Sequence, residues 1–390
     1  MNINVIQEAT RNHETVVGWR RALHQIPELG TKLPQTVAFV AGKLAEMNIP
    51  YEIYEDCSCV TATIGNGGKC ILLRGDMDAL PVLEESGLEF ASTNGLSHAC
   101  GHDFHAASLL GAARILKDHE AELPGTVKLI FQSGEEVFKG AAAAVRSGVM
   151  ENPKVDAAFA THVFASLPLN MVAYGKHPMA SVYGFKIKVQ GKGTHGSSPE
   201  TGVDPLVVGA NILLALQEII AREVPGGEEV ALTIGHFEGG SASNVIPDSA
   251  ILEGTLRAFS PEMREFVIPR ITEIAQSIAM AYRASVTVEE LSSCPAVAVD
   301  DGMMELTLNA VKELGNGMTA VNALHAMGSE DFAVYSEMVP AMIVAMGAGV
   351  EDQSKWVGQH NPKILFDERI LLNEVALYVK VALDWLEKNK

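Results

Sequence analysis

Four short, continuous apolar runs constrain the fold of this chain more than any other feature. They occupy residues 70–74, 127–132, 155–161 and 341–346, and helical patterns separate the first three. Strands that are buried on both faces are apolar throughout, and such strands are typical of parallel sheets. The runs therefore predict an α/β fold, in which helices cover both faces of a mostly parallel sheet.

Polar residues follow the first three runs, at the points where the predicted strands end. The first run leads to Asp76 and Asp78, the second to Glu135 and Glu136, and the third to His162. Ligands of open α/β sheets bind beyond the carboxyl ends of the strands. We therefore expect metal ligands or acid/base groups at this edge of the sheet.

The segment 184–295 has a different pattern, with short strands around two helices at about 203–222 and 261–282. The predicted order is β-α-β-β-α-β, which is typical of a ferredoxin-like α+β unit. Because the segment lies between the third and fourth apolar runs, we expect it to be an inserted domain. Residues 1–183 and 296–390 then form the second of two domains.

A dense group of potential metal ligands precedes an apolar helix predicted at 106–116. Thiolate and imidazole are both good ligands for zinc and similar metals, and the spacing of the cysteine and the second histidine suits an irregular loop around one ion. In the alternative interpretation, the aspartate caps the helix and the histidines lie on a hydrated surface. The group consists of His98, Cys100, His102, Asp103 and His105.

Two adjacent carboxylates, Glu135 and Glu136, follow the second run. Beside a metal, one carboxylate can bind the ion while the other accepts a proton from an activated water. A solvated pair on a loop is the alternative. His162 is also compatible with a core histidine, and His360 alone is a weak signal.

Three polar residues of the inserted segment are further candidates. His195 lies in a glycine-rich loop and could polarise a substrate carbonyl. Asn244 is a second candidate, and Arg257 could bind a carboxylate through two hydrogen bonds. Each of them is also compatible with an ordinary structural role.

Charge and cysteine content exclude several classes of protein. Lys and Arg number 29 against 48 Asp and Glu, so the net charge of −19 argues against nucleic acid or anionic membranes as partners. We find neither a signal-peptide pattern nor a stretch of about 18 uncharged apolar residues, and five cysteines suit a reducing compartment. We therefore expect a cytoplasmic protein. Apart from Cys100, the cysteines are interpreted as ordinary structural residues.

Eight ordered motifs carry a resemblance over nearly the whole chain. The chain resembles the two-metal amidohydrolases and zinc carboxypeptidases, in particular the group of aminoacylases, hippurate hydrolases, auxin-conjugate hydrolases and N-acetyldiaminopimelate deacetylases. The motifs are WRRALHQIPEL (19–29), RGDMDALP (74–81), HACGHDFH (98–105), SGEE (133–136), GTHGSSP (193–199), NVIPDSA (244–250), GSEDF (328–332) and HNPKILFDE (360–368).

The resemblance implies a site with two divalent metal ions and Glu135 as general base. Zinc, manganese, cobalt and nickel all remain open as the metal. The wider family has H-x-D where this chain has Asp76-Met77-Asp78, so Asp78 is expected to support the ligands rather than bind metal. The implied ligands are Cys100, His102, Glu136, His162 and His360.

The resemblance also implies that the inserted domain closes as a lid and forms a homodimer. His195 and Asn244 would then complete an active site of the same chain or of a neighbour, and Arg257 would anchor a carboxylate. The expected activity is metal-dependent hydrolysis of N-acyl amino acids. A dipeptidase or aminopeptidase, and a non-catalytic metal-binding protein, are the alternatives. The preferred acyl group and amino acid and the roles of Asp76, Asp103 and His105 stay open.

Overall fold

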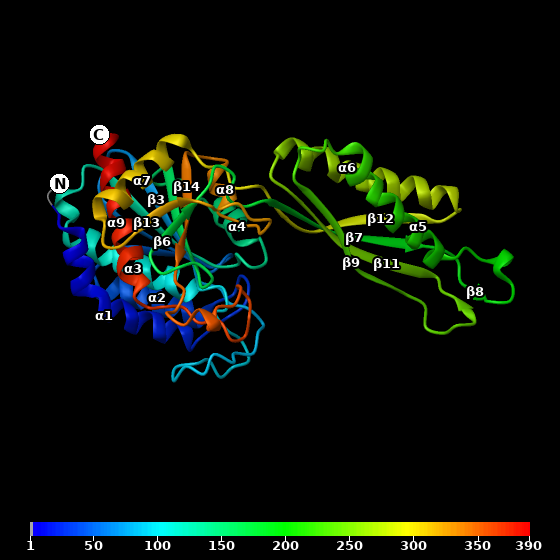
Figure 1. Cartoon of the computed structure of the whole chain (residues 1–390), viewed down its shortest axis with the longest axis horizontal. Coiled ribbons are helices and arrows are strands. Elements are labelled where there is room, and N and C mark those ends of the chain that lie inside the picture. Colours follow the sequence, from blue (N-terminus) through cyan, green and yellow to red (C-terminus); the bar gives the residue numbers. More distant parts are fainter. Residues whose placement is uncertain (1–2) are drawn as a thin grey trace. The chain divides into compact units, whose positions relative to one another are not determined.

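The computed structural model describes residues 3–390, which divide into two compact units (Figure 1). The inserted unit comprises Met179–Val297 and Ala326–Glu330, and the larger unit comprises the rest of the described chain. The boundaries expected from the sequence place 326–330 in the other domain. These residues join the inserted unit because the Ala180 amide donates to the carbonyl oxygens of Ala326 and Gly328.

The larger unit contains a mixed sheet in the order β1-β2-β4-β3-β5-β14-β6-β13. Its four central strands are parallel, and nearly all of their residues are buried. This arrangement confirms the prediction of an α/β fold with a mostly parallel sheet. The central strands are β3 (Cys70–Asp76), β4 (Thr126–Gln132), β5 (Ala157–Phe164) and β14 (Ala341–Gly347).

Four outer strands are not predicted from the sequence. Three of the pairs that they form are antiparallel, namely β1 with β2, β2 with β4 and β6 with β14. These strands lack a continuous run of large apolar residues, because three of them are short and β2 contains small and hydroxylated residues. They are β1 (Tyr51–Tyr54), β2 (Cys59–Gly65), β6 (Met171–Tyr174) and β13 (Thr319–Asn322).

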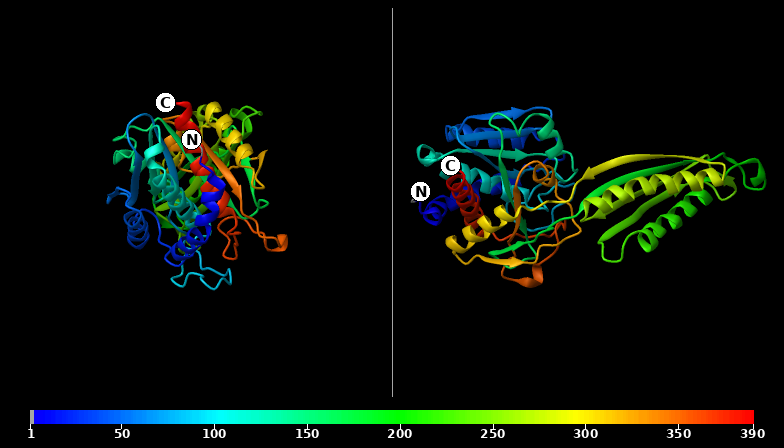
Figure 2. Two further views of the ribbon diagram at one scale, coloured as in Figure 1. Left: turned by 90° about the vertical axis from the view of Figure 1, so that its left-hand side faces the viewer. Right: turned by 90° about the horizontal axis from the view of Figure 1, so that it is seen from above.

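Helices cover the sheet of the larger unit. Helices α3 and α9 pack against the central strands, and α1 packs against these two helices (Figure 2). The helices are α1 (Val5–His24), α2 (Pro34–Glu46), α3 (His102–Asp118), α4 (Gly140–Arg146), α7 (Asp301–Leu314), α8 (Ala333–Ser336) and α9 (Ile370–Lys388), with short 3₁₀ turns η1 (Glu120–Glu122) and η4 (Gln353–Lys355).

The start of α3 differs from the prediction and positions the site. The helix begins at His102 rather than at about residue 106, so His105 lies in its first turn and not in a loop. Its N-cap is Gly101 at φ 91°, where a Cβ atom would lie 2.4 Å from Val163 Cγ2. Only glycine fits this close approach, which brings the first turn of α3 against the end of β5.

The inserted unit is a four-stranded antiparallel sheet in the order β12-β7-β11-β9, and its elements follow in the order β-α-β-β-α-β. Both long helices lie together on one face of the sheet (Figure 1). A two-stranded ribbon of β8 and β10 extends from the sheet. The elements are β7 (Ser181–Gln190), β8 (Thr194–His195), η2 (Pro199–Thr201), α5 (Pro205–Glu218), π-turn η3 (Ile219–Glu223), β9 (Val230–Gly239), β10 (Val245–Ile246), β11 (Ser249–Ala258), α6 (Pro261–Ala281) and β12 (Ser285–Cys294).

One segment of the described chain, Pro205–Glu223, is long and apolar enough to cross a membrane by length and composition alone. It does not stand out in the sequence, because charges such as Glu218 interrupt its C-terminal end. Its inner side chains, among them Val208, Ile212 and Leu216, are buried in the core of the inserted unit. The packing of this helix on the sheet therefore accounts for the apolar residues of its inner face.

Candidate active site

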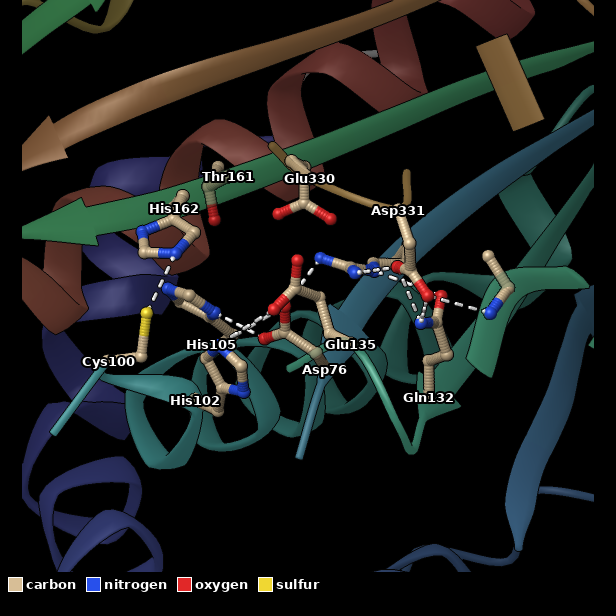
Figure 3. Close-up of polar contacts among 12 residues, drawn as sticks. Asp76, Cys100, His102, His105, Gln132, Glu135, Thr161, His162, Glu330 and Asp331 are labelled. Carbon is tan, nitrogen blue, oxygen red and sulfur yellow. Dashed lines mark hydrogen bonds and ion pairs between the residues drawn. The ribbon is translucent and has the colours of Figure 1, made fainter. Parts of the chain in front are cut away.

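Potential ligands from three central strands and from α3 meet at one end of the sheet in the larger unit. In Figure 3, Cys100, His102 and His162 lie together, with Asp76 and Glu135 beside them. His162 lies in β5, and Glu135 follows the end of β4. The predicted edge of the sheet therefore does bring these side chains together.

Two groups of three potential ligand atoms share one residue. The ligand atoms of Cys100, His102 and His162 lie within 4.8 Å of one another, and so do those of Cys100, Glu136 and His360. These five side chains are the ones that the resemblance implies as metal ligands. Because Cys100 belongs to both groups, the geometry suits two neighbouring ions.

Buried atoms without hydrogen-bond partners test whether a metal fits the two groups. Among the described residues, both ring nitrogens of His102 and Oε1 of Glu136 are buried and have no hydrogen-bond partner. His162 donates from Nδ1 to the Val163 carbonyl (2.9 Å), so its Nε2 lone pair faces Cys100 Sγ at 3.5 Å. Buried polar groups without partners are costly, and these thiol, imidazole and carboxylate atoms suit zinc or a similar ion. The residues fit a divalent metal.

The electrostatics of the site favour positive charge. Burial alone would lower the pKa of His102, but Asp76 and Cys100 outweigh it and raise this pKa well above the usual value. Burial also raises the pKa of Glu136 to about 7, although His102 opposes this shift. Surroundings that stabilise a proton on His102 also stabilise a divalent cation.

Burial shifts the remaining two ligands of the first group toward their neutral forms. It raises the pKa of the Cys100 thiol well above its usual value, and Glu136 adds to this rise. It lowers the pKa of His162 well below the usual value. A neutral His162 keeps the Nε2 lone pair that a metal needs.

Asp78 supports the site from behind. Its two carboxylate oxygens accept the backbone N–H groups of Glu135 and Glu136, each at 3.1 Å. Its Oδ1 also lies 3.5 Å from Nδ1 of His102. One carboxylate therefore holds the backbone of Glu135 and Glu136 and lies beside a candidate ligand, and this contact pattern agrees with a supporting role.

His360 is held differently from the other candidate ligands. Its side chain is 51% exposed, its φ is 67°, and its Nε2 lies 3.5 Å from Glu136 Oε2. Its backbone N–H donates to the Ala99 carbonyl, and the preceding Gln359 donates to the carbonyls of Cys100 and Val163. Gln359 is not among the residues predicted from the sequence, although it stands beside a predicted ligand.

The histidine-rich stretch is not a hydrated surface. Asp103 does not act as the N-cap; it accepts hydrogen bonds from Arg20 Nε (2.7 Å) and His24 Nδ1 (2.8 Å) inside the larger unit. His98 is buried, and burial lowers its pKa to about 4. The alternative interpretation, in which these residues are solvated, is therefore wrong.

A buried network that the sequence does not predict braces the strand ends. Arg74 donates to Asp76 Oδ2 (2.6 Å), to Asp331 Oδ1 (2.8 Å) and to Gln132 Oε1 (3.2 Å). Asp331 also accepts from Gln132 and from the Ala141 amide. Arg74 and Asp331 lie in the RGDMDALP and GSEDF motifs, and this membership is the signal that could have indicated them.

The candidates of the inserted unit lie at two separate ends of its sheet. In the β8–β10 ribbon, His195 pairs with Val245, the neighbour of Asn244, and the Gly196 amide donates to the Asn244 carbonyl. Arg257 lies near the opposite end of β11 from that ribbon, where it donates to Met327 O (2.9 Å) and Ser329 Oγ (3.0 Å). The unit thus groups His195 with Asn244 but not with Arg257.

Comparison with known sequences decides the family. A model of peptidase family M20/M25/M40 matches residues 72–384. The chain belongs to this family. The match spans all the candidate ligands, Glu135 and the whole inserted unit, and it confirms that the chain is a hydrolase of the group that the motifs indicate.

Three relatives illustrate the similarity. The N-acetylcysteine deacetylase of Bacillus subtilis is 34% identical, with 97% of this chain and 98% of that protein covered. The IAA-amino acid hydrolase ILR1-like 4 of Arabidopsis thaliana is 35% identical, with 96% and 86% covered. The structure of Bacillus subtilis YXEP, described as a dinuclear metal binding peptidase of the M20 family, has a TM-score of 0.81 at 33% identity, with 97% and 99% covered.

Proposed function

We propose that this family member hydrolyses the amide bond of N-acyl amino acids with two divalent metal ions and Glu135 as general base. The observation that carries the proposal is the pair of ligand groups that share Cys100, with Glu135 next to them. The relatives named as an N-acetylcysteine deacetylase and an IAA-amino acid hydrolase support the substrate class.

Two sets of side chains would hold the ions. Cys100, His102 and His162 would bind one ion, and Cys100, Glu136 and His360 the other. When bound, such ions polarise a substrate carbonyl and lower the pKa of a water molecule. The donor set is compatible with zinc, manganese, cobalt or nickel.

Glu135 would move the proton. Its Oε2 lies 4.0 Å from His102 Nε2, so the carboxylate reaches the metal-binding group, and Asp78 fixes its backbone. In the proposed reaction Glu135 accepts one proton from the attacking water and passes it to the nitrogen of the leaving amino acid. The amide then yields one carboxylic acid and one amine, with no nucleophilic side chain.

His195 would stabilise the negative oxygen of the tetrahedral intermediate. Its Nδ1 accepts from the Ser197 amide (3.1 Å), so its proton lies on Nε2 and is available to a substrate oxygen. Asn244 would assist it, and Arg257 would bind the carboxylate of the amino acid. His195 could come from the same chain or from a partner chain.

We further propose a cytoplasmic homodimer, with the inserted unit serving as lid and dimer contact. The outer face of α5 supports this, because Val207 and Leu214 are 47% and 66% exposed on one helical face. Exposed apolar stripes are typical of protein interfaces. Analytical ultracentrifugation of the wild type and of Leu214→Glu tests the proposed dimer. We expect the wild type to sediment as a dimer and Leu214→Glu as a monomer. A monomeric wild type would contradict the proposal.

A substrate panel tests the function. Chelated enzyme is resupplied with zinc, manganese, cobalt or nickel and assayed for amine release from N-acetyl, N-benzoyl and indoleacetyl amino acids and from unblocked dipeptides. We expect metal-dependent cleavage confined to the acylated substrates. Cleavage of the dipeptides alone would indicate a peptidase, and absence of cleavage with every metal would indicate a non-catalytic metal-binding protein.

A further inference from the structure

His105 lies between two candidate metal-ligating histidines. Its ring centroid is 4.7 Å from that of His162 and 5.4 Å from that of His102. The ligand atoms of Asp76, His102 and His105 also lie within 4.8 Å of one another, so distance alone would allow a further metal-binding group there. The hydrogen bonds decide between a ligand and a supporting residue.

Both ring nitrogens of His105 are already used, in opposite roles. Nε2 accepts the backbone N–H of Val163 at 2.9 Å and so carries no proton. Nδ1 therefore holds the proton and donates it to Asp76 Oδ1. A neutral imidazole bonded in this way has no lone pair left for a metal ion.

Both carboxylate oxygens of Asp76 also have hydrogen-bond donors. Its second oxygen accepts from Arg74 Nη1 at 2.6 Å, and both side chains are fully buried. Each carboxylate oxygen thus has a short hydrogen bond, and the guanidinium places a fixed positive charge beside the carboxylate. A divalent cation bound by Asp76 would meet that charge at close range in a poorly solvated site.

The chain of contacts ends on a metal ligand. The backbone of Val163 makes both contacts: its N–H donates to His105, and its carbonyl oxygen, in the next peptide group, accepts the Nδ1 proton of His162 (2.9 Å). That second bond turns Nε2 of His162 toward Cys100. Because the two peptide planes meet at the Val163 Cα, the orientation of His162 depends on a backbone conformation at Val163 that His105 holds and Asp76 supports.

We propose that His105 and Asp76 are positioning residues, which hold the backbone at Val163 so that His162 presents Nε2 to the metal, and that neither binds metal itself. This inference rests on the proposed metal site. Outer partners of this kind commonly change metal affinity 10- to 100-fold when they are removed. It assigns a role to two motif residues that the sequence leaves open.

Three substitutions of His105 separate its two hydrogen bonds. His105→Gln places an amide oxygen where Nε2 accepts from Val163, whereas His105→Asn keeps only a donor near Asp76. His105→Leu removes both bonds. The matched control is Ser108→Ala, one turn further along the same buried helix, which loses the hydrogen bond from Ser108 to Glu374 (2.7 Å). His162→Ala is the reference variant, because it removes a proposed metal ligand.

The readouts are zinc affinity by chelator competition, the Co²⁺ absorption spectrum and thermal unfolding of the chelated protein. We expect two ions in every His105 variant, bound about 10- to 100-fold more weakly in His105→Leu, with partial recovery in His105→Gln and less in His105→Asn. The Co²⁺ spectrum should shift in the same order. Ser108→Ala should change thermal unfolding but not zinc affinity.

Two results would overturn the inference. One is wild-type zinc affinity and Co²⁺ spectrum in His105→Leu; the other is loss of a whole ion, as in His162→Ala, which would make His105 a ligand. If His105→Leu does not fold, the zinc affinities of His105→Gln and His105→Asn decide. Equal zinc affinity in these two variants would contradict the proposal. Failure of the wild type to bind two ions would instead refute the proposed function.

Discussion

The histidines of the two units differ in how they are held. In the larger unit, His102, His105 and His162 are buried. Hydrogen bonds to Asp76 and to the backbone of Val163 orient His105 and His162. In the inserted unit, His195 is exposed, and its Nδ1 contacts the amide and the hydroxyl group of the nearby Ser197. The candidate metal ligands of the larger unit thus have a layer of supporting contacts, whereas local turns position the candidate groups of the inserted unit.

The largest effect should come from the acid pair of the larger unit. Glu135→Gln keeps the size of the side chain but removes the base, so we expect kcat to fall by about 10²- to 10⁴-fold. Zinc stoichiometry should stay unchanged in this variant, since Glu135 belongs to neither proposed ligand set. Glu136→Gln provides the comparison, because it should weaken metal binding. Full turnover in Glu135→Gln would refute the mechanism.

The exposed histidine should affect catalysis without affecting metal binding. His195→Ala removes the proposed donor to the oxyanion, and we expect a loss in kcat of about 10²- to 10³-fold. Because the side chain is exposed, thermal unfolding should not change. His236→Ala, another exposed histidine of the same unit, is the matched control and should leave steady-state kinetics intact. A change in zinc affinity in His195→Ala would break the contrast between the two units.

Arg257 should act on binding of the substrate carboxylate. Arg257→Met should raise KM roughly 10- to 100-fold for a substrate with a free α-carboxylate, as expected for loss of a hydrogen bond to a charged group. The corresponding amino acid amide lacks that charge, so its KM should change little. Steady-state kinetics on both substrates measure the difference. Equal changes in KM for the two would show that Arg257 serves the fold instead.

The smallest effect concerns the buried charges behind the metal site. Burial alone would lower the pKa of His24, but Asp103 and Glu84 outweigh it and raise this pKa above 6.5. The protonated form therefore stabilises the fold fully below about pH 6.5, and this contribution disappears as the pH rises through the raised folded-state pKa. Each tenfold gain in the proton affinity of His24 on folding contributes roughly 1.4 kcal/mol to the free energy of unfolding.

Urea unfolding of wild type and His24→Gln at several pH values tests this. The difference in the free energy of unfolding should be largest near about pH 6 and should shrink in alkaline solution. A difference that does not change with pH would mean that His24 stabilises the larger unit by packing alone.

Patterns within the sequence predict those parts of the fold that local burial determines. The apolar runs locate the central strands, because a strand buried on both faces must be apolar. The outer strands and the start of α3 do not follow from such patterns. The first turn of α3 is polar and follows a glycine rather than a typical N-cap residue, so it resembles a loop.

The candidate site shows a similar division. Strand ends and ligand chemistry point to Glu135, Glu136 and His162, and the resemblance adds His360 and the role of Cys100. The contacts that support these residues join distant segments, such as Arg74 with Asp331 and His105 with Val163. The spacing of residues along the chain does not predict such contacts, because they form only when the sheet brings its strand ends together.

The shared cysteine offers the most direct test of the account. Because Cys100 belongs to both ligand groups, its removal should weaken both ions, whereas His162→Ala or His360→Ala should weaken one. The measurement is metal content after equilibrium dialysis against limiting free zinc. The account predicts two ions per wild-type chain, one in each histidine variant and none in Cys100→Ala. Two ions retained in Cys100→Ala, or a single ion in the wild type, would contradict it.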